Sequence, residues 1–177
     1  IDITWAALDG AIPHLDDATA SSARALLGHA EALKARVALA ARQPIAALKI
    51  RHHGDYHLGQ VLMSEHDFII VDFEGEPSRP VAERRVKHSP LRDVAGMIRS
   101  FDYAAAVALR EATAMRDEDR VYLQLYAYAW CRAASAAFTE AYFATVGNSG
   151  VVPPQGGQAL LDLFTIEKAL YEIRYEL

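Results

Sequence analysis

The segment RHHGDYHLGQ, residues 51–60, carries three histidines, one aspartate and one glutamine. These side chains bind metal ions, transfer protons or orient polar loops, so the segment is the first candidate for chemistry. A second acidic segment, DFEGEP at residues 72–77, follows it. The elements between the two segments decide whether their side chains can act together.

The sequence between these segments predicts a β-hairpin. Its strands are expected at Gln60–Met63 and Phe68–Phe73, because β-branched and aromatic residues favour strands, and a polar turn at 64–67 joins them. Antiparallel strands lie about 5 Å apart, so residues before the first strand and after the second are neighbours in space. The hairpin therefore brings Asp55 and Gln60 close to Asp72 and Glu74.

This set of oxygen atoms suggests phosphoryl transfer. Close carboxylates repel one another unless a cation or a proton lies between them, and Mg²⁺ prefers oxygen ligands such as Asp72 and the amide of Gln60. In phosphotransferases, one Asp accepts the proton of the attacking hydroxyl, while a carboxamide and a second Asp hold Mg²⁺ against the phosphates of ATP. Asp55, Gln60 and Asp72 follow that order along the chain.

The remaining sequence predicts helices around the hairpin. They are expected over 16–42 with Pro44 after the end, from Ser89 onward, over 117–144 with Gly147 and Asn148 as the stop, and over 158–177. We therefore expect a mainly α fold with a small central β-hairpin. Arg92 and Asp93 are interpreted as helix-start charges and an ion pair, and Tyr122, Tyr126 and Phe138 as core packing.

Composition narrows the class of protein. The chain has 177 residues, 52% of them hydrophobic, and a formal net charge of −5, which argues against nucleic acid as a partner. No uncharged apolar run is long enough to span a membrane, so no membrane partner is expected. Cys131 is the single cysteine; we interpret it as a buried small hydrophobe in a reducing compartment, which favours the cytoplasm.

Four motifs resemble the C-terminal lobe of bacterial maltokinases: HGDYHLGQVL, DFEGEP, SPLRDVAGMIRSFDYAA and EKALYEIRYEL. The resemblance covers about residues 45–177, and DFEGEP with EKALYEIRYE is its most specific part. It implies an aminoglycoside-phosphotransferase-like, protein-kinase-like fold. It also implies ATP- and Mg²⁺-dependent phosphorylation of maltose to maltose 1-phosphate, within trehalose, glycogen and α-glucan metabolism. Members of this family are often fused to trehalose synthase.

The resemblance also implies roles for individual residues. Asp55 matches the catalytic base, His53 orients its loop, and Gln60 and Asp72 match the ligands of nucleotide-bound Mg²⁺. The expected sugar contacts are His57, Glu74, Glu167, Lys168, Tyr171, Arg174 and Tyr175. Independently, helical spacing places Glu167, Tyr171 and Arg174 on one face of the last helix, with an apolar face beside it at Leu163, Ile166, Leu170, Ile173 and Leu177. Without the motif, those charges would be an ordinary solvated face.

The domain prediction is one kinase-like C-terminal lobe over 1–177, with a first helix at 16–43, the catalytic loop, hairpin and metal loop at 45–80, and a helical sugar-binding part at 89–177. Kinases of this fold also need a glycine-rich cover over the phosphates and a lysine that pairs with them, and this sequence shows neither. We therefore expect the nucleotide-binding N-lobe to be largely absent. Alone, the chain should not phosphorylate maltose at a useful rate.

Three alternatives stay open. His52, His53 and His57 could belong to a zinc or dinuclear hydrolase site, although His66 and His88 are the only further histidines nearby. The acceptor could be an aminoglycoside or an amino alcohol such as choline, for which a richly acidic cleft would be expected. The chain could also be a non-catalytic carbohydrate-binding module derived from a kinase.

Overall fold

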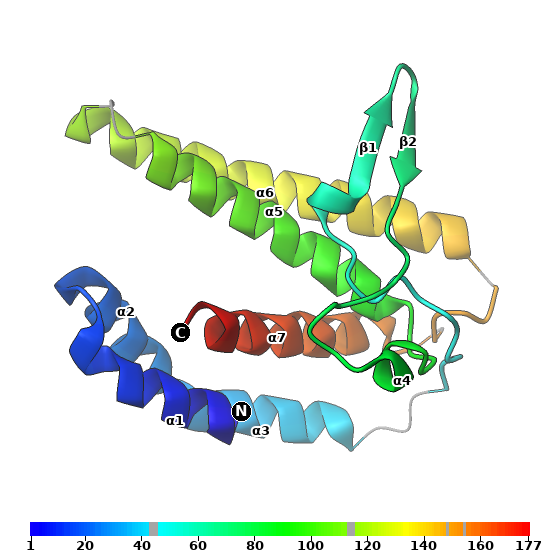
Figure 1. Ribbon diagram of the computed structural model, residues 1–177, viewed down its shortest axis with the longest axis horizontal. Coiled ribbons are helices and arrows are strands. Elements are labelled where there is room, and N and C mark those ends of the chain that lie inside the picture. Colours follow the sequence, from blue (N-terminus) through cyan, green and yellow to red (C-terminus); the bar gives the residue numbers. More distant parts are fainter. Residues whose placement is uncertain (43–45, 113–115, 148, 154) are drawn as a thin grey trace.

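The computed structural model describes residues 1–42, 46–112, 116–147, 149–153 and 155–177. Figure 1 shows a body of helices from which a two-stranded hairpin projects. The elements are α1 (Asp2–Ala11), η1 (Ile12–His14), α2 (Asp17–Leu27), α3 (Ala30–Ala41), η2 (Leu58–Gln60), β1 (Val61–Ser64), β2 (Asp67–Ile70), α4 (Val81–Arg84), α5 (Leu91–Glu111), α6 (Asp117–Val146) and α7 (Gly157–Glu176). The predicted mainly helical fold with one central hairpin is confirmed.

The N-terminal region differs from the single helix predicted over 16–42. That helix begins as expected, because Asp16 Oδ1 accepts hydrogen bonds from Ala18 N and Thr19 N at 3.0 Å. It ends at Leu27, and α3 begins at Ala30, so the prediction of one continuous helix is wrong. Gly28 is the weakest helix former in the segment, so interrupting the helix at this residue costs little free energy. Pro44 and Asn148, the expected helix stops, lie outside the described residues.

The sequence did not predict α1. This helix contributes to a hydrophobic core that it shares with α2 and α7. Trp5 and Leu8, on one face of this helix, are buried together with Ala23 of α2 and Leu170 of α7. Thr4, also buried, donates from its hydroxyl to Leu170 O at 3.4 Å. The N-terminal helices thus pack on the C-terminal helix.

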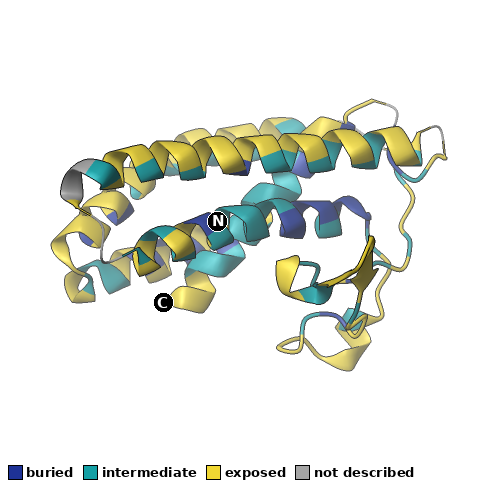
Figure 2. Ribbon diagram, turned by 90° about the horizontal axis from the view of Figure 1, so that it is seen from above, coloured by how far each residue is buried: buried dark blue, intermediate teal, exposed yellow. Residues whose placement is uncertain are grey.

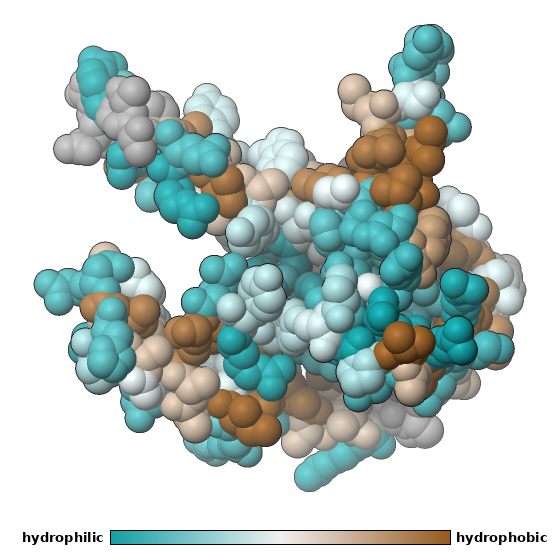
Figure 3. All heavy atoms as spheres, in the orientation of Figure 1, coloured by the Kyte–Doolittle hydropathy of each residue, from teal (hydrophilic) through white to brown (hydrophobic). Residues whose placement is uncertain are grey.

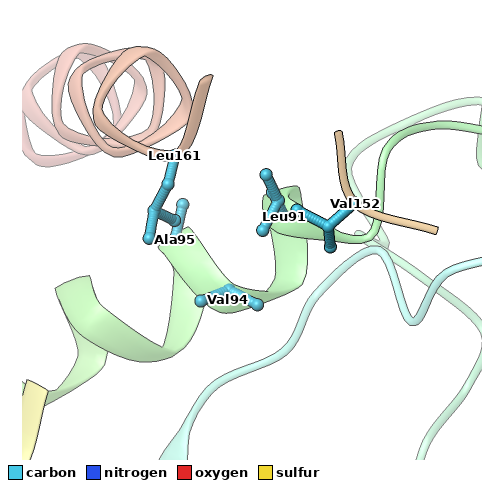
Figure 4. Close-up of a cluster of buried hydrophobic side chains, with 5 residues drawn as sticks. All are labelled: Leu91, Val94, Ala95, Val152 and Leu161. Carbon is cyan, nitrogen blue, oxygen red and sulfur yellow. The ribbon is translucent and has the colours of Figure 1, made fainter. Parts of the chain in front are cut away.

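A second core joins α5 to the start of α7. Figure 4 shows Leu91, Val94 and Ala95 of α5 beside Leu161 of α7 and Val152 of the preceding loop. Leu91 and Leu161 are almost completely buried. Because α5 packs against both α6 and α7, it forms the centre of the helical body.

The hairpin is antiparallel as predicted, with Val61 opposite Ile70 and Ser64 opposite Asp67. Its first strand is Val61–Ser64 rather than Gln60–Met63, and its turn is shorter than the predicted 64–67 because Ser64 and Asp67 are paired. Its second strand ends at Ile70 rather than at Phe73, because Asp72 takes a φ of 62°, which is incompatible with an extended strand. Val71 N still donates to Gln60 O at 3.0 Å, so the two chain segments remain paired up to the polar end.

The hairpin is poorly covered by the rest of the described chain. Figure 2 shows it as mostly exposed, and Figure 3 shows hydrophobic side chains gathered over it. Its exposed apolar residues are Leu62, Met63, Phe68, Ile69 and Ile70. Within the described residues, no helix combines the length and the apolar character needed to cross a bilayer.

Candidate active site

The first turn of α5 fixes the loop that contains Asp55. Asp93 Oδ2 accepts a hydrogen bond from His53 N at 2.7 Å, and Asp93 Oδ1 accepts one from Gly54 N at 2.9 Å. Hydrogen bonds to a carboxylate are about twice as strong as those between neutral groups. One side chain therefore orients two consecutive peptide units directly before Asp55. The interpretation of Asp93 as a helix-start charge and ion-pair partner missed this role.

The imidazole of His53 links this loop to the end of the hairpin. The ring is buried, with Nε2 at 2.8 Å from Val71 O and Nδ1 at 3.4 Å from Asp55 N. A carbonyl oxygen can only accept, so the hydrogen lies on Nε2, and Nδ1 is then the acceptor for Asp55 N–H. The ring also contacts Phe73, with centroids 4.8 Å apart. This is the geometry that an orienting histidine requires.

The two polar loops touch at a pair of glycines. A Cβ placed on Gly54 would lie only 3.2 Å from Gly75 Cα, and both residues have positive φ, 87° and 78°. A Cβ placed on Gly75 would contact the side chain of Arg84, whose Nη1 donates to Glu74 O at 3.2 Å. The loop that contains His53, Gly54 and Asp55 therefore packs directly on the DFEGEP loop.

Gln60 and Asp72 meet at the polar end of the hairpin, as predicted. Gln60 Nε2 donates to Asp72 Oδ2 at 2.9 Å. The positive φ of Asp72 costs of order 1–3 kcal/mol in a residue other than glycine. Such strain persists only where the surrounding contacts impose it, and it is frequent at ligand sites.

The donor set of this pair suits Mg²⁺. Because the amide nitrogen of Gln60 faces Asp72, the bond leaves Gln60 Oε1 and Asp72 Oδ1 for a cation. Mg²⁺ is usually held by one or two protein groups together with substrate phosphates and water. Within the ranges that the structure describes, no three His, Cys, Asp or Glu side chains gather to hold a metal alone. The cluster that a zinc hydrolase would need is therefore not found in those ranges.

The side chain of Asp55 is only 18% exposed. Burial raises the pKa of Asp55 above its ordinary value, and the charge of Glu76 raises it further, while His57, Lys168 and His53 oppose the shift. A carboxylate with a raised pKa is a better proton acceptor when ionised. The environment of Asp55 thus fits a general base.

A cavity of about 120 Å³ opens beside Asp55, between the two loops, α4, the start of α5, and α7. Four of the predicted sugar contacts line it from α7: Glu167, Lys168, Tyr171 and Arg174. Lys168 Nζ lies 5.0 Å from the centre of the Tyr171 ring. The predicted polar face of the last helix is therefore the wall of this cavity. Of the apolar face beside it, Leu170 is buried whereas Leu177 is exposed.

The other predicted sugar contacts do not line the cavity. His57 Nδ1 accepts a hydrogen bond from Gly59 N at 3.1 Å, while its Nε2 lies 3.8 Å from Asp55 Oδ2. The side chain of Glu74 is 83% exposed. The exposed ring of Tyr175 stacks on Tyr171, with centroids 6.3 Å apart. These three residues lie around the site rather than inside it.

Sequence reasoning missed other residues that line the cavity: His52, Glu76, Arg79, Glu83, Arg84, His88, Arg92 and Phe164. Arg92 pairs with Glu167 at 2.8 Å instead of with its neighbour Asp93. The rings of His52 and His88 meet edge to face at 5.2 Å, and burial lowers the pKa of each. Glu76 had a usable signal, because it lies two residues after Glu74 in the same acidic loop.

The known sequences that are similar to this chain include glucosamine kinases. The one from Streptacidiphilus jiangxiensis is 32% identical over 96 residues, which is 54% of this chain and 20% of the relative. The one from Mycolicibacterium smegmatis (strain ATCC 700084 / mc(2)155) is 34% identical over 131 residues, 70% of this chain and 30% of the relative. The chain therefore spans less than a third of the length of these curated relatives. No protein-family model matches the sequence.

Solved structures show the fold. A glucosamine kinase in complex with glucosamine, ADP and inorganic phosphate aligns with a TM-score of 0.68 and 23% identity, over 97% of this chain and 40% of that one. Crystal form B of a glucosamine kinase aligns with a TM-score of 0.71 and 24% identity, over 97% and 38%. The chain thus has the helical, hairpin-containing portion of a kinase-like fold, as the sequence predicted.

Proposed function

We propose that this chain is the acceptor- and metal-binding lobe of an ATP-dependent sugar kinase. The observation that carries the proposal is the contact between the two loops at Gly54 and Gly75. It joins a largely buried Asp55, which lines a cavity, to the loop that begins with the paired Asp72. A proton acceptor on one loop and a cation site on the loop packed against it are what phosphoryl transfer needs.

In the proposed mechanism, a sugar hydroxyl in the cavity attacks the γ-phosphorus of ATP. Asp55 accepts the hydroxyl proton, the new O–P bond forms, the bond to the bridging β–γ oxygen breaks, and ADP leaves. Gln60 and Asp72 would hold Mg²⁺, which when bound neutralises charge on the phosphates. His53 and Asp93 act by holding the Asp55 loop in position.

Glucosamine is the acceptor we favour. The similar sequences and folds are named glucosamine kinases. The cavity of about 120 Å³ is well below the roughly 300–1,000 Å³ of pockets for drug-sized ligands, which suits a single sugar ring. Glu76 and Glu83 add carboxylates to the lining that the sequence analysis had not placed there.

Maltose is the second candidate. The motif resemblance favours it, and the exposed ring of Tyr175 stacked on Tyr171 offers an apolar surface beyond the cavity for a second sugar ring. With maltose the product would be maltose 1-phosphate, and fusion to trehalose synthase would follow from the resemblance. The relatives and solved structures described above are named glucosamine kinases and not maltokinases.

The rest of the kinase belongs to the same proposal. The structures that align with this chain are more than twice as long, since it covers 38–40% of them. We expect a nucleotide-binding lobe to supply the glycine-rich cover and the lysine, and to bury the exposed apolar hairpin. A cytoplasmic location follows from the requirement for ATP.

Calorimetry and a transfer assay test this proposal. Glucosamine, glucose and maltose are titrated into the chain, and ADP release is followed in a protein that joins it to its nucleotide-binding lobe. We expect glucosamine to bind to the chain. We expect it to be phosphorylated by the joined protein only when Mg²⁺-ATP is present. Sugar binding without transfer in the joined protein would indicate a binding module, and absence of both would refute the proposal. Preferential phosphorylation of maltose would select the second candidate.

A further inference from the structure

Glu76 lines the cavity and is held in place by a chain of hydroxyl groups. Ser78 Oγ donates to Glu76 Oε1 at 3.1 Å and lies 3.2 Å from Tyr171 Oη of α7. The link ties the DFEGEP loop to the helix that forms the opposite wall. It engages one carboxylate oxygen of Glu76 and leaves Oε2 without a partner among the described residues.

The other acidic residues of the cavity are less available for a ligand. Both oxygens of Asp93 accept hydrogen bonds from the loop amides, and Glu167 is paired with Arg92. Glu83 is exposed on the short helix α4. Glu76 is therefore the carboxylate beside Asp55 that is both fixed in position and free to bind.

The overall charge of the cavity cannot select an acceptor. Five acidic residues line it, Asp55, Glu76, Glu83, Asp93 and Glu167, and so do five basic ones, Arg79, Arg84, Arg92, Lys168 and Arg174. Their formal charges cancel, so recognition of a charged group must come from a local contact. Such a contact is strong when a carboxylate meets an ammonium group, because the hydrogen bonds are charge-assisted.

We propose that Glu76 is the specificity residue of this site, and that its carboxylate binds the ammonium group of an amino-sugar acceptor while Asp55 receives the proton of the reacting hydroxyl. This inference rests on the proposed function. The Ser78–Tyr171 link holds Glu76 in place, so that the amine and the reacting hydroxyl are positioned together. A neutral hexose, with a hydroxyl in place of the amine, would form only an ordinary hydrogen bond there.

The test compares glucosamine with glucose, which differs at the position of the amine. Calorimetry on the full chain measures both dissociation constants for wild type, Glu76→Gln and Glu76→Asp. Glu140→Gln, which removes an exposed charge from α6 outside this cavity, is the control. Circular dichroism and thermal unfolding confirm that each variant is folded.

We expect Glu76→Gln to weaken glucosamine binding by roughly 10- to 100-fold and to leave glucose binding almost unchanged, as loss of a charge-assisted hydrogen bond predicts. Glu76→Asp should retain part of the preference, and Glu140→Gln should retain all of it. Equal weakening of both sugars by Glu76→Gln, or an equal loss from Glu140→Gln, would overturn the assignment while leaving the sugar-kinase proposal intact. Wild-type protein that binds neither sugar would refute both.

Discussion

Gly96 of α5 and Tyr56 of the candidate catalytic loop lie in direct contact. A Cβ placed on Gly96 would be 2.6 Å from Tyr56 O, a distance that real Cβ atoms essentially never show. Because Asp55 immediately precedes Tyr56, this contact sets how deeply the proposed base sits against the helix. The absence of a side chain at Gly96 is thus a requirement of the site and not of the helix.

The variant Gly96→Ala separates these two requirements. Alanine is a better helix former than glycine by roughly 1 kcal/mol, so α5 alone would gain stability. We expect instead a loss of about 1–3 kcal/mol in the free energy of unfolding, together with weaker sugar binding, because the loop must move away. Urea unfolding and calorimetry measure the two effects.

Gly10→Ala is the matched control, because a Cβ on Gly10 of α1 meets nothing within 4 Å. There the same substitution should stabilise the chain by roughly 0.5–1 kcal/mol. Stabilisation at both positions would mean that the close approach of Tyr56 does not constrain Gly96.

Asp55→Asn tests the proposed base. In the kinase that contains this chain and its nucleotide-binding lobe, we expect the turnover rate to fall by roughly 10²–10⁴-fold, the usual contribution of general-base catalysis. Sugar affinity should change little, because the amide keeps the shape and one acceptor oxygen. Steady-state kinetics measure the turnover rate and calorimetry measures the affinity. The control is Asp9→Asn, at an exposed residue of α1. A near-normal rate would remove Asp55 from the mechanism.

The neighbours of Asp55 should move its titration in opposite directions. Burial and Glu76 hold its pKa above the ordinary 3.8, and Lys168 opposes this shift. Glu76→Gln should therefore lower the pKa, and Lys168→Met should raise it. Carboxyl ¹³C NMR titration of the chain measures each shift, and movement in the same direction in both variants would contradict this electrostatic account.

The raised pKa also has a consequence for stability. The folded chain keeps the Asp55 proton to a higher pH than the unfolded chain does. Raising the pH from about 3.8 through the folded-state pKa therefore costs stability at this residue. The catalytic rate should instead increase over the same pH range, because Asp55 becomes ionised as the pH rises. We expect the acidic limb of the rate profile to lie above the value for an ordinary aspartate.

Local signals explain which parts of the fold were predictable. The hairpin followed from its β-branched residues, and the pairing of Val61 with Ile70 then brought Gln60 to Asp72 without further information. The wall of the cavity followed from helical spacing in α7. Composition led to one wrong prediction. The Ala- and Leu-rich segment around Gly28 is typical of one continuous helix, and only the packing of α3 on α7 requires two separate helices.

Long-range contacts explain what was missed. The hydrogen bonds that Asp93 accepts from His53 and Gly54 join residues about 40 positions apart in the sequence. No local sequence pattern predicts such bonds. The helix α6 is apolar on several faces, so its sequence does not show which one packs. Tyr122 and Tyr126, expected in the core, are 66% and 74% exposed.

The bonds of Asp93 give the last prediction. Asp93→Asn keeps one acceptor oxygen but turns an amide N–H₂ toward the N–H of His53 or Gly54, leaving that donor without a partner. We expect a loss of about 1–3 kcal/mol in the free energy of unfolding and faster hydrogen exchange at those two amides. Asp102→Asn on the same helix is the control, because its half-exposed ion pair with Arg99 should contribute less than about 1 kcal/mol. Equal losses at both positions, with unchanged exchange in the loop, would mean that Asp93 does not hold the catalytic loop.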